Sequence, residues 1–268
     1  MYTKFFNKPK YLLGALIPAI FSFNVSATVI DNTFDGGIPA NWGCTGNCGV
    51  AGADGVVTAA PTGANNYGWV STDNGVNGVG LDGLVGTDGS VLTSNLFAAN
   101  AGDDLEFFFN YVTSDGAGYA DYAWARLLDE SLNQVAMLFT ARTKESGNIV
   151  PGIGMPAPEA TLSPGSVEII AGAPSWSVLG SDSNSCFSSG CGYTGWVQSN
   201  YSILTAGSYY LEFGVTNWTD TAHDSGLAFD GITIAGVAID PVAVPEPAGV
   251  ALFSLALLGL ARIKRNRV

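Results

Sequence analysis

The sequence predicts an all-β protein, a single antiparallel β-sandwich of residues 28–240. Short runs rich in aromatic and β-branched residues alternate with clusters of Gly, Asn, Asp and Ser. No long stretch repeats apolar residues with the 3.6-residue period of an amphipathic helix. The chain has 268 residues, which leaves ample length for one such domain between two terminal targeting segments.

The expected strands, in chain order, cover residues 66–70, 104–112, 119–129, 134–142, 207–218 and 227–235. In the second, Leu105, Phe107, Phe109 and Tyr111 alternate with more polar positions and are expected to face the core. Residues 129–133 have the composition of a hairpin turn. We therefore expect the second, third and fourth strands to form a meander of neighbours in one sheet.

Finer expectations follow from the same alternation. Val135, Met137, Phe139 and Ala141 are expected on one face of their strand, and Tyr209, Leu211, Phe213 and Val215 on the core face of theirs. Residues 146–195 contain five prolines and are expected to form a long excursion over the sandwich, pinned by Trp176.

The N-terminus has the three parts of a secretory signal peptide, residues 1–27. Lys4, Lys8 and Lys10 form the positive region, and residues 11–23 form the apolar region. Val25, Ser26 and Ala27 supply the small residues of a cleavage site, which predicts cleavage between Ala27 and Thr28. The sequence therefore predicts export through the inner membrane.

The C-terminus has a second tripartite pattern. A linker, 241–247, ends in Val244, Pro245, Glu246 and Pro247; an uncharged apolar run, 248–261, follows; the tail, 262–268, carries Arg262, Lys264, Arg265 and Arg267. A helix of this length covers about 21 Å, short of a bilayer core of about 30 Å, so Arg262 and Lys264 must snorkel or the bilayer must thin. The basic cluster is expected on the cytoplasmic side.

This tail resembles the PEP-CTERM sorting signal, which exosortases of Gram-negative bacteria recognise. The resemblance covers about a tenth of the chain and implies a transmembrane sorting helix held transiently in the inner membrane. It also implies an exosortase-type processing protease as partner, with cleavage near Pro245–Pro247. The expected destination is the cell surface or an exopolysaccharide (biofilm) matrix. The resemblance concerns sorting, so the role of the body must come from its own residues.

The expected mature body is strongly acidic. Only Arg126, Arg142 and Lys144 are basic in residues 28–247, against 23 acidic residues, a net charge of −20. Such a surface repels phosphates, which excludes nucleic acid as a partner. It also repels anionic polysaccharide unless cations bridge the two.

The four cysteines form two close pairs, Cys44 with Cys48 and Cys186 with Cys191. In an oxidising compartment this spacing favours two local disulfide loops. The other two connectivities stay open on sequence alone, as does a zinc site that uses both pairs.

The opening segment around Asp35 and the closing segment around Asp230 resemble those of bacterial jelly-roll modules of the carbohydrate-binding type. In such modules the first and last strands are neighbours, and carboxylates from both can hold a structural calcium. By position the candidate ligands are Asp31, Asp35 and Asp230, with backbone carbonyls completing the shell. The alternative is that these aspartates serve turns and strand ends.

Sequence gives little support for catalysis. His223 is the only histidine, it lies in a polar loop, and no Gly-x-Ser-x-Gly elbow is present. Glu106 and Glu212 are a candidate carboxylate pair for glycoside hydrolysis. Trp69, Trp124 and Trp218 either stack on sugar rings or belong to the core. We expect a surface or matrix component without catalytic activity; the alternatives are a carbohydrate-binding jelly-roll module and a secreted hydrolase.

Overall fold

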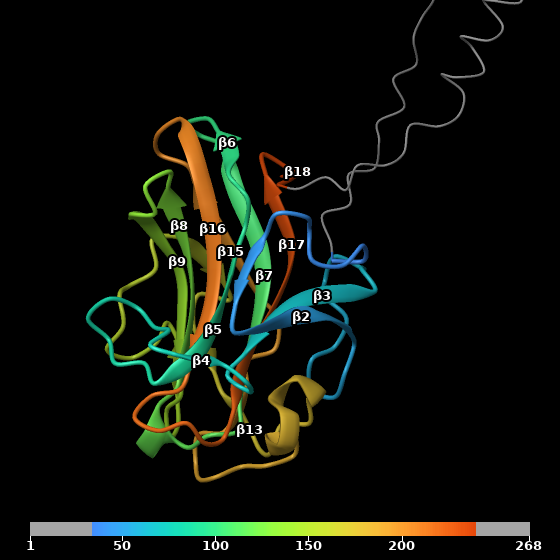
Figure 1. The fold of residues 1–268 in the computed structure, drawn as a ribbon, viewed down its shortest axis with the longest axis vertical. Coiled ribbons are helices and arrows are strands. Elements are labelled where there is room, and N and C mark those ends of the chain that lie inside the picture. The colour runs from blue at the N-terminus through green and yellow to red at the C-terminus, as the bar shows by residue number, and fades with distance from the viewer. Residues whose placement is uncertain (1–33, 240–268) are drawn as a thin grey trace, which may run out of the picture.

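The computed structural model describes residues 34–239, and the expected targeting segments lie outside these residues. The described chain is all-β and folds as two packed antiparallel sheets (Figure 1). This confirms the predicted fold class. Within the described part of the chain, no helix is long and apolar enough to cross a membrane.

The first sheet has the strand order β1-β5-β16-β8-β9, with two short strands added at its margins. Its members are β1 (Gly43–Thr45), β5 (Asp88–Thr93), β16 (Gly207–Thr216), β8 (Tyr122–Asp129) and β9 (Gln134–Arg142), with β4 (Val76–Asn77) on β5 and β6 (Phe97–Ala99) on β16. The hairpin between β8 and β9 turns at 129–133 as predicted, where the Asp129 amide donates to the Asn133 carbonyl at 2.9 Å.

The second sheet has the order β11-β15-β7-β17-β3-β2. Its members are β11 (Thr161–Ser163), β15 (Val197–Ser202), β7 (Asp104–Thr113), β17 (Ser225–Ile234), β3 (Asn66–Ser71) and β2 (Asn47–Gly52), joined by β13 (Ile170–Ala171), β14 (Gly192–Tyr193) and β18 (Val237–Ala238). A small separate ladder joins β10 (Asn148–Val150) to β12 (Val167–Glu168). Two 3-10 turns complete the described chain: η1 (Ala117–Tyr119) and η2 (Ser177–Asp182).

Aromatic side chains from both sheets fill the space between them. Phe109 of β7 stacks on Phe139 of β9 with ring centroids 3.8 Å apart, and Phe213 of β16 stacks on Phe229 of β17 at 4.0 Å. All four are fully buried, and the alternation of β7 and β16 predicts this for Phe109 and Phe213. Because each large apolar side chain contributes about 1.5–3 kcal/mol on full burial, this layer anchors the fold.

The predicted meander is wrong. β7 pairs with β15 and β17 in the second sheet, whereas β8 and β9 pair in the first. The connection between β7 and β8 includes η1, so β8 begins at Tyr122 rather than at Tyr119. The reason is physical: the aromatic row of β7 is buried between the sheets, where Phe107 and Phe109 pack across the interior on Phe139 of β9 and Phe213 of β16.

The predicted face of β9 is also wrong. The β8–β9 register shifts at two bulges, so that Phe139 pairs with Ala125 but Met137 pairs with Arg126. Phe139 and Ala141 therefore belong to the central core, Met137 faces outward, and Val135 is 40% exposed. An extra residue in one strand reverses the side-chain alternation beyond it, which a strict two-residue period cannot anticipate.

Loops cover both outer faces of the sandwich. On the first sheet, Leu81 of the loop 78–87 packs on Trp124. On the second sheet, Trp176 is fully buried and its Nε1 donates to Tyr67 Oη at 3.0 Å, so it pins the long excursion as predicted. The outer faces are therefore shaped by loops, and two hollows remain on them, one on each sheet.

Candidate functional site

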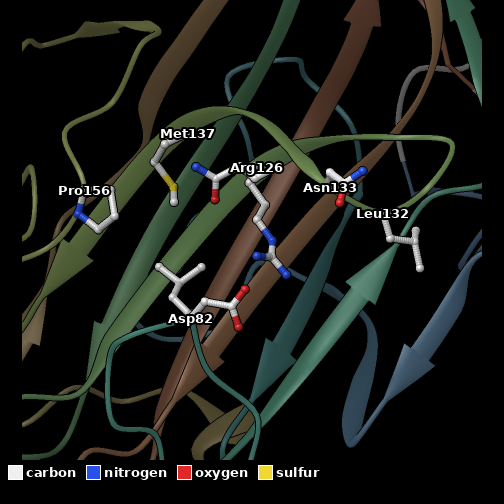
Figure 2. A pocket seen from close by; sticks show the side chains of 8 residues that line it. Asp82, Arg126, Leu132, Asn133, Met137 and Pro156 are labelled. Atoms are coloured by element: carbon white, nitrogen blue, oxygen red, sulfur yellow. The ribbon is translucent and has the colours of Figure 1, made fainter.

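A polar hollow of about 240 Å³ lies on the outer face of the first sheet (Figure 2). We call it the Arg126 hollow; it is lined by Leu81, Asp82, Arg126, Leu132, Asn133, Gln134, Met137 and Pro156. Its lining comes from β8, from β9 with the hairpin turn, and from two covering loops. Figure 2 shows the Arg126 guanidinium inside this ring of side chains, with the Asp82 carboxylate pointing toward it from the loop 78–87.

Arg126 is held in place by a carboxylate of the neighbouring strand. Its Nε donates to Glu212 Oε1 at 2.6 Å and its Nη2 donates to Oε2 at 3.2 Å, a two-point ion pair across β8 and β16. Trp124 Nε1 also donates to Glu212 Oε1, at 3.0 Å. The side chains of Arg126 and Glu212 are 19% and 9% exposed, so the pair is strengthened by partial exclusion of water.

A glycine makes this network possible. Gly214 pairs with Trp124 across β16 and β8, and a Cβ at this glycine would lie 2.2 Å from Trp124 Cζ2. The indole therefore lies flat on the Gly214 backbone, where its N–H reaches Glu212. Trp124 is only 1% exposed, so its ring is a structural support under the hollow rather than a surface for a ligand.

The walls of the Arg126 hollow are tied to the sheet. The Leu81 amide donates to Tyr122 Oη at 3.2 Å, and Thr216 Oγ1 donates to the Val79 carbonyl at 2.7 Å, which fixes the loop 78–87. On the other side, the Glu159 amide donates to the Met137 carbonyl at 2.7 Å. The hollow is therefore largely formed without a ligand, which lowers the ordering cost of binding.

The chemistry of the Arg126 hollow suits a ligand with many hydroxyl groups. Arg126 keeps donors that Glu212 does not use, Asp82 supplies acceptors, and Asn133 and Gln134 supply both. No ion pair joins Asp82 to Arg126, so both groups can form hydrogen bonds with a ligand in the hollow. Leu81, Met137 and Pro156 add the apolar wall that contacts C–H groups. The sequence signal missed was Arg126 itself, one of three basic residues in an acidic body.

Both predicted local disulfides are present in the structure. Cys44 is bonded to Cys48 and Cys186 to Cys191, and no free cysteine remains among the described residues. A zinc site made from both pairs is therefore wrong, since oxidised cysteines cannot ligate zinc as thiolates. The first disulfide links β1 of the first sheet to β2 of the second.

The sorting and cleavage residues, Val25, Ala27, Thr28, 244–247 and the basic tail, lie outside the described residues. So does Asp31, one of the three candidate calcium ligands. Asp35 and Asp230 are both described, and the pKa of Asp230 is raised by burial and, to a smaller extent, by the Asp35 charge. Burial is the main cause of that rise, to about 6.

Both aspartates already have partners in the protein. Thr62 Oγ1 donates to Asp230 Oδ2 at 2.5 Å, and the Asn66 amide donates to Asp35 Oδ1 at 2.7 Å. No group of three His, Cys, Asp or Glu side chains within residues 34–239 is arranged to hold a metal ion. The two carboxylates fit the charge of a divalent cation, and calcium at this end of the sandwich remains a prediction.

Calcium should raise the melting temperature of the protein if it binds between Asp35 and Asp230. Because it would bind only the folded form, a hundredfold excess over Kd adds about 2.7 kcal/mol of stability. The measurement is a melting curve in chelator and in millimolar calcium, with magnesium as the control ion. A calcium-specific rise that disappears in Asp230→Asn is expected; equal shifts from both ions would show only general screening of an acidic surface.

The two candidate glutamates lie on different sheets. Glu106 lies on β7 of the second sheet, where it accepts from Asn200 Nδ2 at 2.6 Å, whereas Glu212 lies on β16 of the first. Both point away from the core, so they lie on opposite outer faces and cannot flank one scissile bond. Of the candidate tryptophans, Trp218 has its ring covered by Arg142, whose guanidinium carbon lies 4.8 Å from the ring centroid. Trp69 is half-buried beside the hollow on the second sheet.

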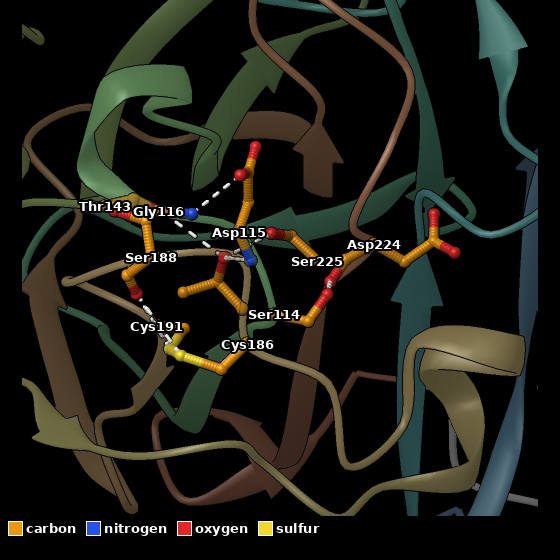
Figure 3. The surroundings of a disulfide bond; sticks show 10 residues. Ser114, Asp115, Gly116, Thr143, Cys186, Ser188, Cys191, Asp224 and Ser225 are labelled. Carbon is orange, nitrogen blue, oxygen red and sulfur yellow. Dashed lines mark hydrogen bonds between the residues drawn. A yellow bond between two sulfur atoms is a disulfide. The ribbon is translucent and has the colours of Figure 1, made fainter.

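One end of the sandwich gathers carboxylates that sequence reasoning did not connect. We call it the acidic end; it consists of Asp115, Asp121, Asp182, Asp220 and Asp224 with His223, from the loops 114–121, 182–191 and 217–224. The Phe187 amide donates to the Ser114 carbonyl at 3.0 Å, and the Ala117 amide to the Ser189 carbonyl at 2.9 Å. Figure 3 shows Asp115 and Gly116 beside Ser188 and the Cys186–Cys191 disulfide, which closes this loop.

Burial dominates the electrostatics of the acidic end. It raises the pKa of Asp115 to about 7 and that of Asp224 to about 7, and it raises the pKa of Asp121 well above its usual range. Asp121 accepts from Ser225 Oγ at 2.7 Å and from the Trp218 amide at 2.9 Å, whereas Asp115 Oδ2 has no hydrogen-bond partner in the described part of the chain. These groups are therefore expected to hold protons at mildly acidic pH.

Comparison with known proteins gave distant structural matches only. No family model and no curated protein matches the chain. The K1 cleaved adhesin domain of Lys-gingipain from Porphyromonas gingivalis W83 matches at 15% identity and TM-score 0.35, over 75% of this chain and 95% of that domain. TmCBM61, solved with β-1,4-galactotriose, matches at 12% identity and TM-score 0.35, over 76% of this chain and 93% of TmCBM61.

A third match is the enzymatically active domain of tailspike protein 4 from bacteriophage CBA120, at 10% identity and TM-score 0.36. The match covers 76% of this chain but 21% of the tailspike chain, so this protein spans about a fifth of its length. Similarity at this level identifies neither a family nor a function for this chain.

Proposed function

We propose that this protein is an exported carbohydrate-binding β-sandwich of jelly-roll-like type, which holds glycan at the cell surface or in an exopolysaccharide matrix without catalysing a reaction. The observation that carries this proposal is the Arg126 hollow, where a guanidinium is fixed by Glu212 beneath a rim of Asp82, Asn133 and Gln134. Fixed donors and acceptors around a small hollow are what a sugar ring with several hydroxyl groups requires.

The charge distribution favours a neutral glycan. Arg126 is already paired with Glu212, Asp82 adds a negative charge to the rim, and the body as a whole is strongly acidic. An anionic sugar would gain one contact with Arg126 but would approach against this field. Glu106 and Glu212 lie on opposite outer faces of the sandwich, so they do not form a carboxylate pair for glycoside hydrolysis. Their positions therefore agree with a binding role.

A glycan array is the experiment that tests the proposed function. The exported protein should bind neutral oligosaccharides, and Arg126→Ala should lose the binding that occurs in the Arg126 hollow, because the donors and the position of Glu212 are lost together. Lys144→Ala removes the same charge from beyond the far end of β9 and is the matched control. Absence of binding to every arrayed glycan, or unchanged binding by Arg126→Ala, would remove the proposal.

The proposed location depends on the C-terminal tail and has its own test. In its native host the extracellular protein should lack the residues beyond the Pro245–Pro247 motif, because an exosortase-type protease removes the membrane-held tail. Intact mass and C-terminal peptide mapping measure this directly. An extracellular form that retains Arg267 would contradict processing at this motif.

A further inference from the structure

A second hollow, of about 220 Å³, lies on the outer face of the second sheet. We call it the Trp69 hollow; it is lined by Asn47, Val50, Ala51, Trp69, Asp73, Ser177 and Val178. Its lining comes from β2, from β3 and the turn that follows it, and from the start of η2. In Figure 1, β2 and β3 lie at the opposite side of the molecule from β8 and β9. Nothing in the function proposed above uses it.

Trp69 presents a flat ring to this hollow because its neighbour is a glycine. Gly49 pairs with Trp69 across β2 and β3, and a Cβ at Gly49 would lie 2.4 Å from Trp69 Cζ2. One ring face therefore lies on the Gly49 backbone. The ring is half-buried, and its Nε1 is itself buried with no hydrogen-bond partner among the described residues, so the ring contributes its apolar surface and not its N–H to the hollow.

Polar groups with unused acceptors surround the ring. Asn47 Nδ2 donates to the Asp73 carbonyl at 2.7 Å, which orients the amide and leaves its Oδ1 as an acceptor. Ser177 Oγ donates to Asp54 Oδ2 at 2.5 Å, so it is fixed as well. The Asp73 carboxylate packs against Gly180, and no side-chain or backbone donor within residues 34–239 is hydrogen-bonded to it. The lining contains an acidic group and no basic one.

The position of β2 is fixed by the Cys44–Cys48 disulfide. Cys48 and Asn47 are the first residues of β2, and Gly49 follows directly. The backbone amide of Asn47 also donates to Ser90 Oγ of the first sheet at 2.7 Å. The disulfide and this hydrogen bond together fix the start of β2 relative to the first sheet. Asn47 and Gly49 therefore keep their positions beside Trp69, and the hollow does not need to be assembled on binding.

We propose that the Trp69 hollow is a second glycan site, in which the apolar face of a neutral or amino-sugar pyranose stacks on Trp69 while its hydroxyl groups donate to Asp73 and Asn47. The proposal rests on the proposed function only for the class of ligand. Aromatic rings bind such C–H faces, and a carboxylate accepts from neighbouring hydroxyl groups. An anionic sugar is disfavoured here because Asp73 has no basic neighbour in the lining.

Two sites on opposite faces would make the protein bivalent. One molecule then joins two glycan chains, and repeated contacts along a polysaccharide raise the overall avidity well above that of either site. This gives a physical basis for a cohesive role in an exopolysaccharide matrix. It predicts that the protein cross-links a polysaccharide, whereas a variant with one working site binds it without cross-linking.

The test combines a glycan array of neutral, amino-sugar and anionic oligosaccharides with titration calorimetry on the strongest ligand. Asp73→Asn and Asn47→Ala change the rim without removing core volume, and each should weaken binding at this site at least tenfold. Trp69→Ala should remove one of two binding events, while Trp69→Phe, which keeps an aromatic face, should retain part of the affinity. Melting curves identify any variant that has lost the fold.

The outcomes separate this site from the Arg126 hollow. If Asp73→Asn, Asn47→Ala and Trp69→Phe all bind as wild type while Arg126→Ala abolishes binding, the second site is wrong and the proposed function stands. If Arg126→Ala binds as wild type while the Trp69 hollow variants do not, the second site stands alone. Binding to no glycan by the folded wild type would overturn both.

Discussion

Replacing Glu212 with alanine should destabilise the protein by about 3 kcal/mol and should also abolish glycan binding in the Arg126 hollow. Breaking a largely buried ion pair by removing one partner costs about 3–5 kcal/mol, because the remaining charge stays desolvated. Here Arg126 would lose both of its carboxylate contacts, and Trp124 Nε1 would lose its acceptor in a buried position. Urea unfolding measures the first effect and calorimetric titration measures the second.

Asp82→Ala is the control that separates the two effects of Glu212. Asp82 lines the same hollow but makes no ion pair with Arg126, so its loss should weaken binding and leave stability nearly unchanged. Glu212→Gln keeps the side-chain volume and one acceptor, and it should fall between wild type and Glu212→Ala in both measurements. A Glu212→Ala protein as stable as wild type would contradict the supporting role assigned to this carboxylate.

The stability of the protein should fall by several kcal/mol as the pH rises from about 4 to about 7.5 in the presence of chelator. The pKa of Asp115 is raised from 3.8 to about 7, and that of Asp224 also to about 7. Between the unfolded and folded pKa values the folded state binds more protons than the unfolded chain, so stability decreases with pH. One pKa unit corresponds to about 1.4 kcal/mol, and solvent screening reduces this at partly exposed carboxyls, so Asp115 and Asp224 together account for a change on the order of a few kcal/mol.

Asp115→Asn tests this pH dependence directly. The amide has the shape of the protonated carboxyl and cannot ionise, so the variant should lose less stability between about pH 4 and about pH 7.5 than wild type. The nearby groups act in both directions: Asp182 and Asp220 raise the pKa of Asp115, whereas His223 lowers it. A wild-type protein that is more stable at about pH 8 than at about pH 5 in chelator would contradict the burial of ionisable carboxyls at the acidic end.

Much of the fold could be predicted from local pattern. The alternation of β7 and β16 gave the buried aromatic rows, and the polar segment 129–133 gave the hairpin. The sheet to which β7 belongs could not be predicted, because two aromatic rows can lie side by side or face to face with the same alternation. The face on which Met137 lies could not be predicted either, because a bulge depends on how two strands pair and not on one strand alone.

The candidate sites depend on contacts that no single stretch of sequence contains. Arg126 and Glu212 are 86 residues apart and meet only because β8 and β16 pair. Trp69 and Trp124 both lie within predicted strands, and the sequence does not distinguish them. In the structure Trp69 is half-buried beside a hollow, whereas Trp124 is covered by the loop that carries Leu81. The pairing of each with a cross-strand glycine, Gly49 and Gly214, became visible only in the sheets. The disulfide pairing, by contrast, could be predicted, because the cysteines of each pair are only four or five residues apart in the sequence.

The measurement that tests the central claim most directly is titration calorimetry of the strongest neutral oligosaccharide from the array into wild type, Arg126→Ala and Lys144→Ala. The two variants have the same net charge, so a difference between them reports the Arg126 hollow and not the overall field. Loss of hydrogen bonds to a charged group is worth about 1.5–3 kcal/mol, which predicts a loss of affinity of at least about tenfold in Arg126→Ala and none in Lys144→Ala. Equal affinities in all three folded proteins would show that this hollow does not bind glycan.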